Sequence, residues 1–165
     1  LALPFLLFSS PNVGKLLAGG CVSLLGLGLR AYASGCILKE EELATGGPYG
    51  IIRHPLYGGS FLVGFGLAVA SGRWWLLLGF VASFFWMYGR TIRAEEAKLE
   101  ALFGAAYRRY RQEVPAVLPR FRGRSVIGDG GGFRSWLYWR NNEWQAALGT
   151  LAGYGLLWAR MWFLE

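Results

Sequence analysis

The sequence has few of the side chains on which metal-dependent, hydrolytic or disulfide-stabilised proteins depend. One of its 165 residues is histidine and two are cysteine. Cys21 and Cys36 fall on one predicted helix, where a rise of about 1.5 Å per residue places them about 22 Å apart, and a disulfide needs Cα atoms within about 7 Å. No Cys-x-x-Cys, His-Glu-x-x-His, Ser-His-Asp or phosphate-binding loop motif is present. The sequence therefore predicts no metal site and shows no machinery for hydrolysis or nucleotide phosphate chemistry.

Four long stretches of the chain have almost no charge. Two of them hold no charged residue, and each of the other two holds a single arginine. Hydrophobic residues make up 54% of the sequence and the mean hydropathy is +0.33, more apolar than the core of a soluble domain of this size requires. Because a bilayer core takes about 20 apolar helical residues, the pattern predicts an all-α, polytopic membrane bundle of four to five spans. A soluble bundle with buried helices is the less favoured alternative. The spans are expected near 16–38, 55–71, 74–93 and 143–164, with residues 1–8 as the end of a fifth.

The net charge of +7 is unevenly distributed. Residues 95–142 hold nine cations and five acids. Cytoplasmic segments of membrane proteins carry an excess of Lys and Arg, so we expect this region and the loop at 39–54 to face the cytoplasm, with residues 71–73 on the opposite side. A bacterial source would place such a protein in the inner membrane. We expect the arginines to contact anionic lipid headgroups rather than nucleic acid, because no recognition motif accompanies them.

Between residues 92 and 112 the apolar pattern becomes amphipathic, which indicates that the third span continues into the cytoplasm or restarts there as a helix. Gly104 is expected to break this helix or to allow close packing. Pro115 and Pro119 are expected to end the helical region.

Two polar clusters stand at the edges of apolar runs, where ionisable residues are costly unless they pair or bind something. The first holds the only histidine, His54, between Arg53 and Pro55, with Tyr49 and Tyr57 nearby. A lone interfacial histidine is more often structural than catalytic. Here, however, a cation, an imidazole, two phenols and glycine backbone N–H groups can form a polar, aromatic-walled site for a small anionic or zwitterionic molecule.

The second cluster is the Arg-Ala-Glu-Glu sequence at residues 93–96. On a helix Glu96 and Glu100 share a face, while Glu95 points about 100° away. The simple interpretation is a solvated face that pairs with neighbouring cations. The functional interpretation is a pair of buried carboxylates that bind ribose hydroxyls or an ammonium group. The spacing alone does not decide which glutamate faces a ligand.

Four stretches then combine in one order: GLRAYA at 28–33, GPYGIIRHPLYGG at 47–59, EEAKL at 95–99 and FGAAYRRYRQEVP at 103–115. In this order and spacing the sequence resembles the isoprenylcysteine carboxyl methyltransferases and the related phospholipid methyltransferases, from about residue 26 to 119. These are integral membrane enzymes that use S-adenosylmethionine. The resemblance implies a cofactor enclosed by the two polar clusters at the cytoplasmic face of the membrane, and a lipid-facing tunnel for a lipophilic acceptor, isoprenylcysteine-like or phospholipid-like.

The resemblance also assigns roles to single residues, again as expectations. A carboxylate acceptor would be positioned by Arg90, Arg93 or Arg30, and an ammonium acceptor would lose its proton to Glu95, Glu96 or His54. The expected catalytic residues are Arg90, Arg93, Glu95 and Glu96. The expected cofactor-binding residues are Tyr49, Arg53, His54, Pro55, Tyr57, Gly58, Glu95 and Glu96.

The same reading divides a single membrane-embedded domain into four parts. These are N-terminal membrane helices at 1–45, a cofactor-binding catalytic core at 46–119, a basic linker at 120–142 and a last membrane helix at 143–165. Two alternatives from other classes remain: an NADPH-dependent membrane reductase of similar architecture, and a non-catalytic membrane scaffold or transporter. The first would need a hydride pocket and a basic patch for the 2′-phosphate, and the second leaves both polar clusters without a role.

Overall fold

The structure, a computed structural model, describes residues 2–38, 42–118 and 132–163, and every regular element in these ranges is helical. The chain forms two compact units. Unit 1 consists of residues 1–28, 59–86 and 144–165, and unit 2 of residues 29–58 and 87–143. The elements are α1 (Ala2–Phe8), α2 (Val13–Gly35), the 3₁₀ helix η1 (Gly47–Gly50), α3 (Pro55–Ala70), α4 (Trp74–Glu113), α5 (Ser135–Arg140) and α6 (Trp144–Phe163).

Helices α2, α3 and α6 begin and end within a few residues of the predicted spans, whereas α4 begins at the predicted residue and continues to Glu113. By length and composition α2 and α4 can cross a membrane, and α3 is a shorter apolar helix. In α4 the uncharged, apolar stretch is residues 74–89, and the charged residues follow it. The number of spans, four to five, and the cytoplasmic placement of the second half of α4 stay predictions.

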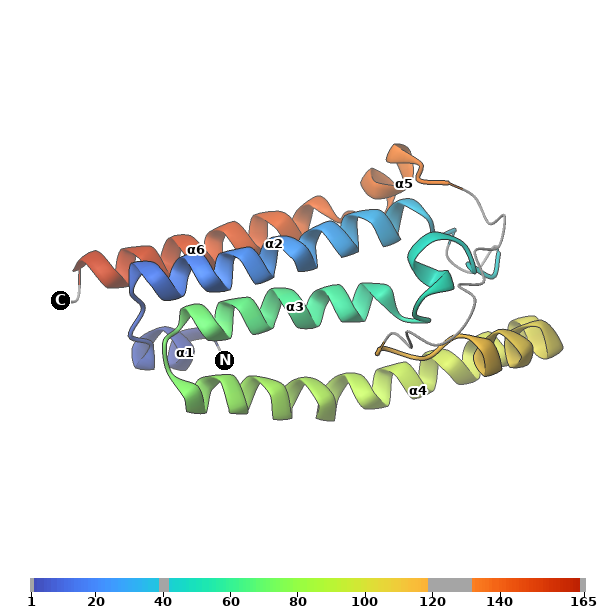
Figure 1. Cartoon of the computed structure of the whole chain (residues 1–165), viewed down its shortest axis with the longest axis horizontal. Coiled ribbons are helices and arrows are strands. Elements are labelled where there is room, and N and C mark those ends of the chain that lie inside the picture. Colours follow the sequence, from blue (N-terminus) through green and yellow to red (C-terminus); the bar gives the residue numbers. More distant parts are fainter. Residues whose placement is uncertain (1, 39–41, 119–131, 164–165) are drawn as a thin grey trace. The chain divides into compact units, whose positions relative to one another are not determined.

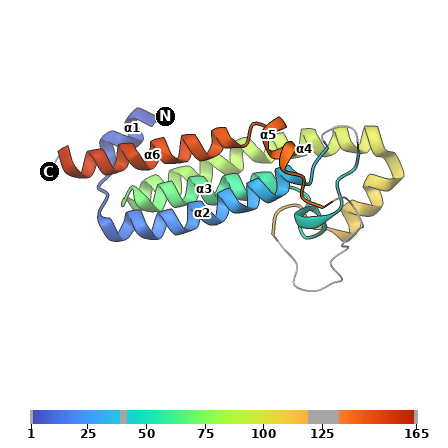
Figure 2. The same cartoon turned by 90° about the horizontal axis from the view of Figure 1, so that it is seen from above.

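In unit 1, α2 and α3 approach closely because their facing positions hold glycines. A Cβ atom on Gly19 would lie 2.2 Å from the Gly66 carbonyl oxygen, and a Cβ atom on Gly26 would lie 2.6 Å from the Gly59 carbonyl oxygen. Small residues let membrane helices pack backbone against backbone. Within this unit the segments of α2, α3, α4 and α6 lie side by side (Figure 1 and Figure 2).

A polar contact and an aromatic cluster join the helices of unit 1. The Ser23 hydroxyl donates to the Val63 carbonyl oxygen at 3.0 Å and lies 3.0 Å from the Tyr154 hydroxyl of α6. These contacts give the packing a defined register, because a side-chain hydroxyl in an apolar bundle needs a partner. Apolar packing comes from a buried core of Leu16, Ala70 and Leu157, and from tilted and edge-on ring contacts among Phe61, Phe80, Phe84 and Phe85.

In unit 2, α4 continues past its apolar stretch to Glu113 and bends once. Gly104 has φ 52° and ψ −121°, a non-helical conformation inside the helix. Positive φ is favourable for glycine because it has no Cβ atom. The expected break at Gly104 is therefore present, and after it the chain turns Tyr107, Tyr110 and Val114 into a buried cluster.

The predicted basic linker at 120–142 is only partly testable, because residues 119–131, with Pro119 and three of the linker arginines, lie outside the described residues. Its second part contains a short helix. Residues 135–140 form α5, Leu137 is 1% exposed, and the Arg134 N–H donates to the Gly35 carbonyl oxygen at 2.9 Å. The sequence did not predict this helix because the surrounding segment is rich in arginine and glycine. The helix is held by the burial of Leu137 and by its contact with the end of α2.

Candidate functional site

The first polar cluster begins in a tight turn that the sequence predicted only as a loop. Gly46 is extended, Gly47 has φ 56°, and η1 follows directly. The positive φ explains the glycine at position 47, because side chains with a Cβ atom rarely adopt it. The turn buries Tyr49, whose side chain is 5% exposed, and the Tyr110 hydroxyl of α4 donates to the Tyr49 carbonyl oxygen at 2.6 Å.

The backbone of Arg53 and His54 is fixed by the segment that follows α4. The Arg53 N–H donates to the Pro115 carbonyl oxygen at 2.8 Å, and the His54 N–H donates to the Ala116 carbonyl oxygen at 3.0 Å. Pro55, buried, then opens α3, where its missing N–H costs nothing. These contacts hold the turn before α3 so that the side chains of Arg53 and His54 both point towards α4.

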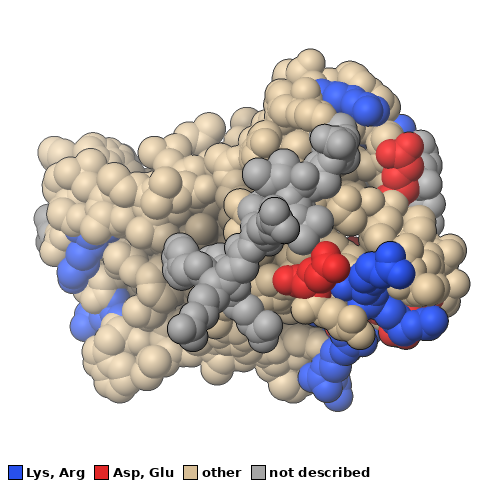
Figure 3. All heavy atoms as spheres, turned by 45° about the vertical axis from the view of Figure 1, so that its right-hand side comes forward, with Lys and Arg blue, Asp and Glu red and all other residues tan. Residues whose placement is uncertain are grey.

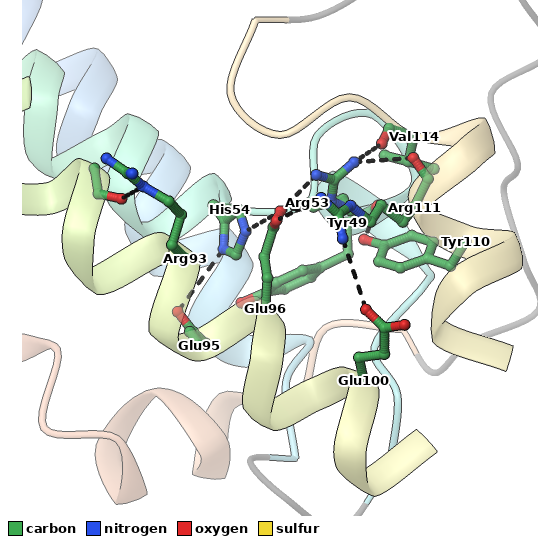
Figure 4. A network of polar contacts seen from close by, with 11 residues as sticks. Tyr49, Arg53, His54, Arg93, Glu95, Glu96, Glu100, Tyr110, Arg111 and Val114 are labelled. Atoms are coloured by element: carbon green, nitrogen blue, oxygen red, sulfur yellow. Dashed lines mark hydrogen bonds and ion pairs between the residues drawn. The ribbon is translucent and has the colours of Figure 1, made fainter. Parts of the chain in front are cut away.

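Arg53 contacts two residues of α4 and the residue that follows the helix with one guanidinium group (Figure 4). Its Nε donates to Glu96 Oε1 at 3.2 Å, and its Nη2 forms a short contact with the same oxygen. Its Nη1 donates to the carbonyl oxygens of Arg111, at 3.1 Å, and Val114. These carbonyls belong to the end of the helix, which has no intrahelical donors for them. Arg53 therefore caps α4 and pairs with Glu96 at once.

His54 lies between the two glutamates of the second cluster. Its Nε2 is 3.2 Å from Glu96 Oε1, where the imidazole N–H donates to the carboxylate, and its Nδ1 is 3.8 Å from Glu95 Oε2. The His54 side chain is 4% exposed. The Tyr57 ring packs on it with centroids 5.7 Å apart, and Tyr57 also packs on Tyr88 of α4. Although Glu95 and Glu96 point in different directions from the helix, one imidazole is within reach of both.

The electrostatics of the site keep Glu96 ionised. Burial by itself would raise the pKa of Glu96, but the hydrogen bonds from Arg53 and His54, and their charge, outweigh burial and lower it below the ordinary value of 4.5. Burial is also the main reason that the pKa of Tyr49 is raised, and Tyr110 and Glu95 add to that effect. Glu96 is thus a fixed negative charge, and Tyr49 is a neutral hydroxyl.

Three buried polar atoms of this region have no hydrogen-bond partner among the described residues: Tyr49 Oη, Glu95 Oε2 and Tyr107 Oη. Buried polar atoms in native proteins nearly always have partners, so each exception asks for an explanation. Two of the three, on Tyr49 and Glu95, belong to residues predicted to bind the cofactor. A ligand that supplies hydroxyl or ammonium donors would satisfy both.

The structure brings together most of the predicted site residues and leaves two at its margin. Arg93 is exposed, and its Nε donates to the Gly89 carbonyl oxygen one turn back at 2.9 Å. Arg90 is exposed as well. Gly58 lies in the first turn of α3, and a Cβ atom there would make ordinary contacts, the nearest at 3.4 Å to Ile52. The catalytic roles of Arg90 and Arg93 stay predictions.

Sequence reasoning missed the residues that hold the cluster from behind. Tyr107 and Tyr110 were noticed as part of a motif but given no role, and the carbonyl oxygens of Arg111 and Val114 leave no trace in a sequence. The available sign was the apolar spacing of Phe103, Tyr107, Tyr110 and Val114 along one face, which indicates a packed face on the amphipathic helix that the sequence predicts there. Basic and acidic side chains lie next to one another on the face that Figure 3 shows. In unit 2, Arg111 Nη1 lies 3.6 Å from Glu100 Oε2.

The sequence profile of the phospholipid methyltransferase family matches residues 19–106, which include both polar clusters and more than half of the chain. The chain belongs to this family. No solved structure matches it.

Individual relatives agree with that assignment. The chain is 35% identical over 81 residues to protein-S-isoprenylcysteine O-methyltransferase of Schizosaccharomyces pombe, covering 49% of this chain and 34% of the relative. It is 33% identical over 84 residues to the Xenopus laevis protein of the same name, covering 51% of this chain and 29% of the relative. It is 34% identical over 98 residues to the cobalt-zinc-cadmium resistance protein CzcN of Cupriavidus metallidurans, covering 58% of this chain and 44% of the relative. The chain thus spans less than half the length of each.

These findings bear on the alternatives from the sequence. The family and two of these relatives are methyltransferases, so a membrane reductase is not favoured. Within the described residues no group of three His, Cys, Asp or Glu side chains could hold a metal ion.

Proposed function

We propose that this chain is a membrane-embedded, S-adenosylmethionine-dependent methyltransferase that acts on a carboxylate or amine of a lipophilic acceptor. The cofactor site is the cluster of Tyr49, Arg53, His54, Glu95 and Glu96 in unit 2. Membership of the phospholipid methyltransferase family supports the reaction type, and the apolar helices α2 and α4 support the membrane location.

One observation carries the proposal: a buried histidine within reach of two adjacent glutamates, one of which has an unbonded oxygen. The side chains of Arg53 and His54 both form hydrogen bonds with Glu96 Oε1. Glu95 Oε2, at 3.8 Å from His54 Nδ1, keeps its capacity to accept hydrogen bonds. A purely structural cluster would be expected to satisfy that oxygen, because an unmet buried acceptor is costly.

The residues fit S-adenosylmethionine by their chemistry. The cofactor has ribose hydroxyls, an ammonium group and a sulfonium cation, which need acceptors and negative charge. Glu95 and Glu96 supply the negative charge, and the unpartnered Tyr49 hydroxyl can bond a carboxylate or a hydroxyl. When bound, the cofactor supplies a methyl group activated by the sulfonium. The chain contributes alignment of the two reactants, which can lower a barrier by about 7–11 kcal/mol.

The acceptor is proposed only as a class. A carboxylate acceptor is already nucleophilic and needs a cation to position it, for which the exposed Arg90 and Arg93 stand one turn from the cluster on α4. An amine acceptor must lose a proton, which Glu95 or His54 can accept. The relatives named above carry different substrate descriptions, two isoprenylcysteine methyltransferases beside one metal-resistance protein.

The first experiment measures binding of S-adenosylhomocysteine to the purified chain in detergent by calorimetry. Glu95→Gln keeps the shape of the side chain but removes the charge from an oxygen that accepts no hydrogen bond among the described residues. We expect its affinity to fall about ten- to a hundredfold, because a hydrogen bond to a charged group contributes about 1.5–3 kcal/mol. The matched control is Glu113→Gln, an exposed residue of the same helix. Equal affinity in Glu95→Gln and wild type would rule out this site, and absence of binding to wild type would refute the proposal.

The second experiment concerns the acceptor. Radiolabelled S-adenosylmethionine is offered with short- and long-chain versions of prenylcysteine analogues and of aminophospholipids. We expect methylation to rise with chain length, since each buried methylene contributes about 0.8 kcal/mol to binding. Equal methylation of short, water-soluble analogues would contradict a lipophilic acceptor while leaving the cofactor site standing.

A further inference from the structure

The chain after the family-matched region folds back onto the end of α2 within unit 2. The Arg134 N–H donates to the Gly35 carbonyl oxygen, and Asn141 Nδ2 donates to the Ser34 carbonyl oxygen at 3.0 Å. These two carbonyls are among those that the end of a helix leaves without partners. The Phe133 ring also stacks on Tyr32 of α2, with centroids 6.3 Å apart. Residues 132–143 therefore serve as the C-terminal cap of α2.

The turn at the end of this segment places a carboxylate against an arginine of α2. Asn142 adopts φ 55°, which Asn tolerates better than most residues. Glu143 then meets Arg30 in a two-point ion pair, with Nε to Oε2 at 3.0 Å and Nη2 to Oε1 at 3.0 Å. The side chains of Arg30 and Glu143 are 22% and 6% exposed. A paired, buried arrangement of this kind holds a guanidinium in one orientation.

That orientation reaches the corner from which His54 projects. Arg30 Nη1 donates to the Leu56 carbonyl oxygen at 3.4 Å. Leu56 is two residues after His54, in the first turn of α3, and the Gly58 N–H donates to the His54 carbonyl oxygen at 3.0 Å. The Arg30 guanidinium thus links a carboxylate of residue 143 to the turn that carries the imidazole.

We propose that Glu143 is a positioning residue for the candidate cofactor site: by holding the Arg30 guanidinium against the Leu56 carbonyl, it fixes the first turn of α3 and with it the His54 imidazole. The catalytic description of that site rests on the proposed function, but the mechanical link does not. Glu143 lies outside the matched residues 19–106, so this role belongs to the C-terminal part of this chain and not to the family core.

Glu143 can hold Arg30 in place because the guanidinium has several N–H donors that need acceptors. Glu143 accepts from two nitrogens of the guanidinium and neutralises its charge. Without that carboxylate a buried cation has a strong incentive to turn towards water, and a turn of the guanidinium removes the donor from Leu56. His54 would then keep its contact with Glu96 but lose part of what sets its backbone.

The test uses the single histidine as a probe in the full chain in detergent. With ¹⁵N-labelled histidine the imidazole signals belong to His54 alone. In Glu143→Gln we expect these signals to shift in the ligand-free protein, and the affinity for S-adenosylhomocysteine to fall about two- to thirtyfold, the range in which residues that act through another modulate a site. Glu143→Asp should lie between Glu143→Gln and wild type. The control Glu113→Gln should leave the signals and the affinity unchanged.

A double variant, Arg30→Met with Glu143→Met, guards against misfolding, because replacing both members of a buried pair with apolar residues is often neutral for stability. It should shift the His54 signals as Glu143→Gln does. Unmoved signals and affinity in both variants would overturn the proposal and leave the pair as a clamp on the C-terminal segment. Tighter binding or faster methylation of an anionic acceptor in Glu143→Gln would also overturn it, because Glu143 would then compete with the acceptor for Arg30. If wild type fails to bind S-adenosylhomocysteine but the signals shift, the proposed function is wrong and the mechanical link stands.

Discussion

Glu96 is the residue on which the polar contacts of unit 2 converge. Arg53 and His54 both bond its Oε1, and Arg111 Nη2 lies 3.8 Å from its Oε2. The same Arg53 closes the end of α4 through the carbonyls of Arg111 and Val114. Removing the carboxylate would therefore leave two nearby cationic or polar groups unsatisfied and loosen the helix end. Glu96 has a structural role whatever ligand the site takes.

The lowered pKa of Glu96 makes that role depend on pH in one direction. A carboxyl group whose pKa is lower in the folded than in the unfolded protein stabilises the fold fully above its unfolded pKa, here 4.5. The contribution is lost as the pH falls through that value towards the folded pKa. In thermal unfolding scans in detergent, Glu96→Gln should be less stable than wild type by about 1.5–3 kcal/mol at pH 7. The gap should narrow as the pH falls below 4.5.

Other carboxylates titrate in the same window, so the informative quantity is the difference between variant and wild type at each pH. Glu113→Gln serves as the reference for an exposed carboxyl group on the same helix. A gap between Glu96→Gln and wild type that does not narrow as the pH falls below 4.5 would contradict the lowered pKa.

Among the elements, the pair α2 and α3 depends on glycine more than on any large side chain. A Cβ atom on Gly19 would lie 2.2 Å from the Gly66 backbone oxygen, whereas on the adjacent Gly20 it would meet nothing within 4 Å. Gly19→Ala should lower the melting temperature, because forcing atoms into a packed contact typically costs about 1–3 kcal/mol. Gly20→Ala should be neutral or stabilising, since alanine favours a helix by about 1 kcal/mol over glycine. Equal melting temperatures for the two variants would refute the close approach.

Helix α4 offers a second matched pair, this time for backbone conformation. Gly104 has φ 52°, and Gly79, in the apolar half of the same helix, has helical geometry and open space around it. Gly104→Ala should destabilise the protein by about 1–3 kcal/mol, because a residue with a Cβ atom is strained at this conformation. Gly79→Ala should not destabilise it. Thermal unfolding of both variants in detergent would show whether the bend at Gly104 is fixed.

The elements that the sequence predicted well are those with a long, uniform pattern. Absence of charge over residues 55–70 and 74–89 located α3 and the first half of α4, since hydropathy depends on composition alone. The cost of charge near a membrane indicated that the two polar clusters pair or bind something, but it did not indicate that Arg53 and His54 would pair with Glu96. The sequence did not predict α5, with its buried Leu137. This helix is held by contacts with the end of α2, which lies about a hundred residues earlier in the chain.

At the scale of the whole molecule, the family-matched residues 19–106 are not the whole of unit 2. That unit also takes in α5, the turn with Glu143 and the segment after α4 that bonds the backbone of Arg53 and His54. The site is therefore assembled from the family core and from segments that follow it. A truncation after residue 118 should lose the cap on α2 and the partner of Arg30, even though every residue of both polar clusters would remain.

Sidedness is the remaining property of the whole molecule, and the distribution of arginine predicts it. Nine cations against five acids in residues 95–142 predict that this region faces the cytoplasm and that the turn before α4 lies on the opposite side. In a variant without Cys21 and Cys36, single cysteines are placed at the exposed positions Arg73 and Gln112 and treated with a membrane-impermeant thiol reagent on intact cells. We expect labelling of Arg73→Cys in intact cells, and of Gln112→Cys only after the cells are opened. The opposite pattern would place the glutamates of α4 on the side of the membrane away from the cytoplasm. A cofactor that is made in the cytoplasm could not reach them on that side.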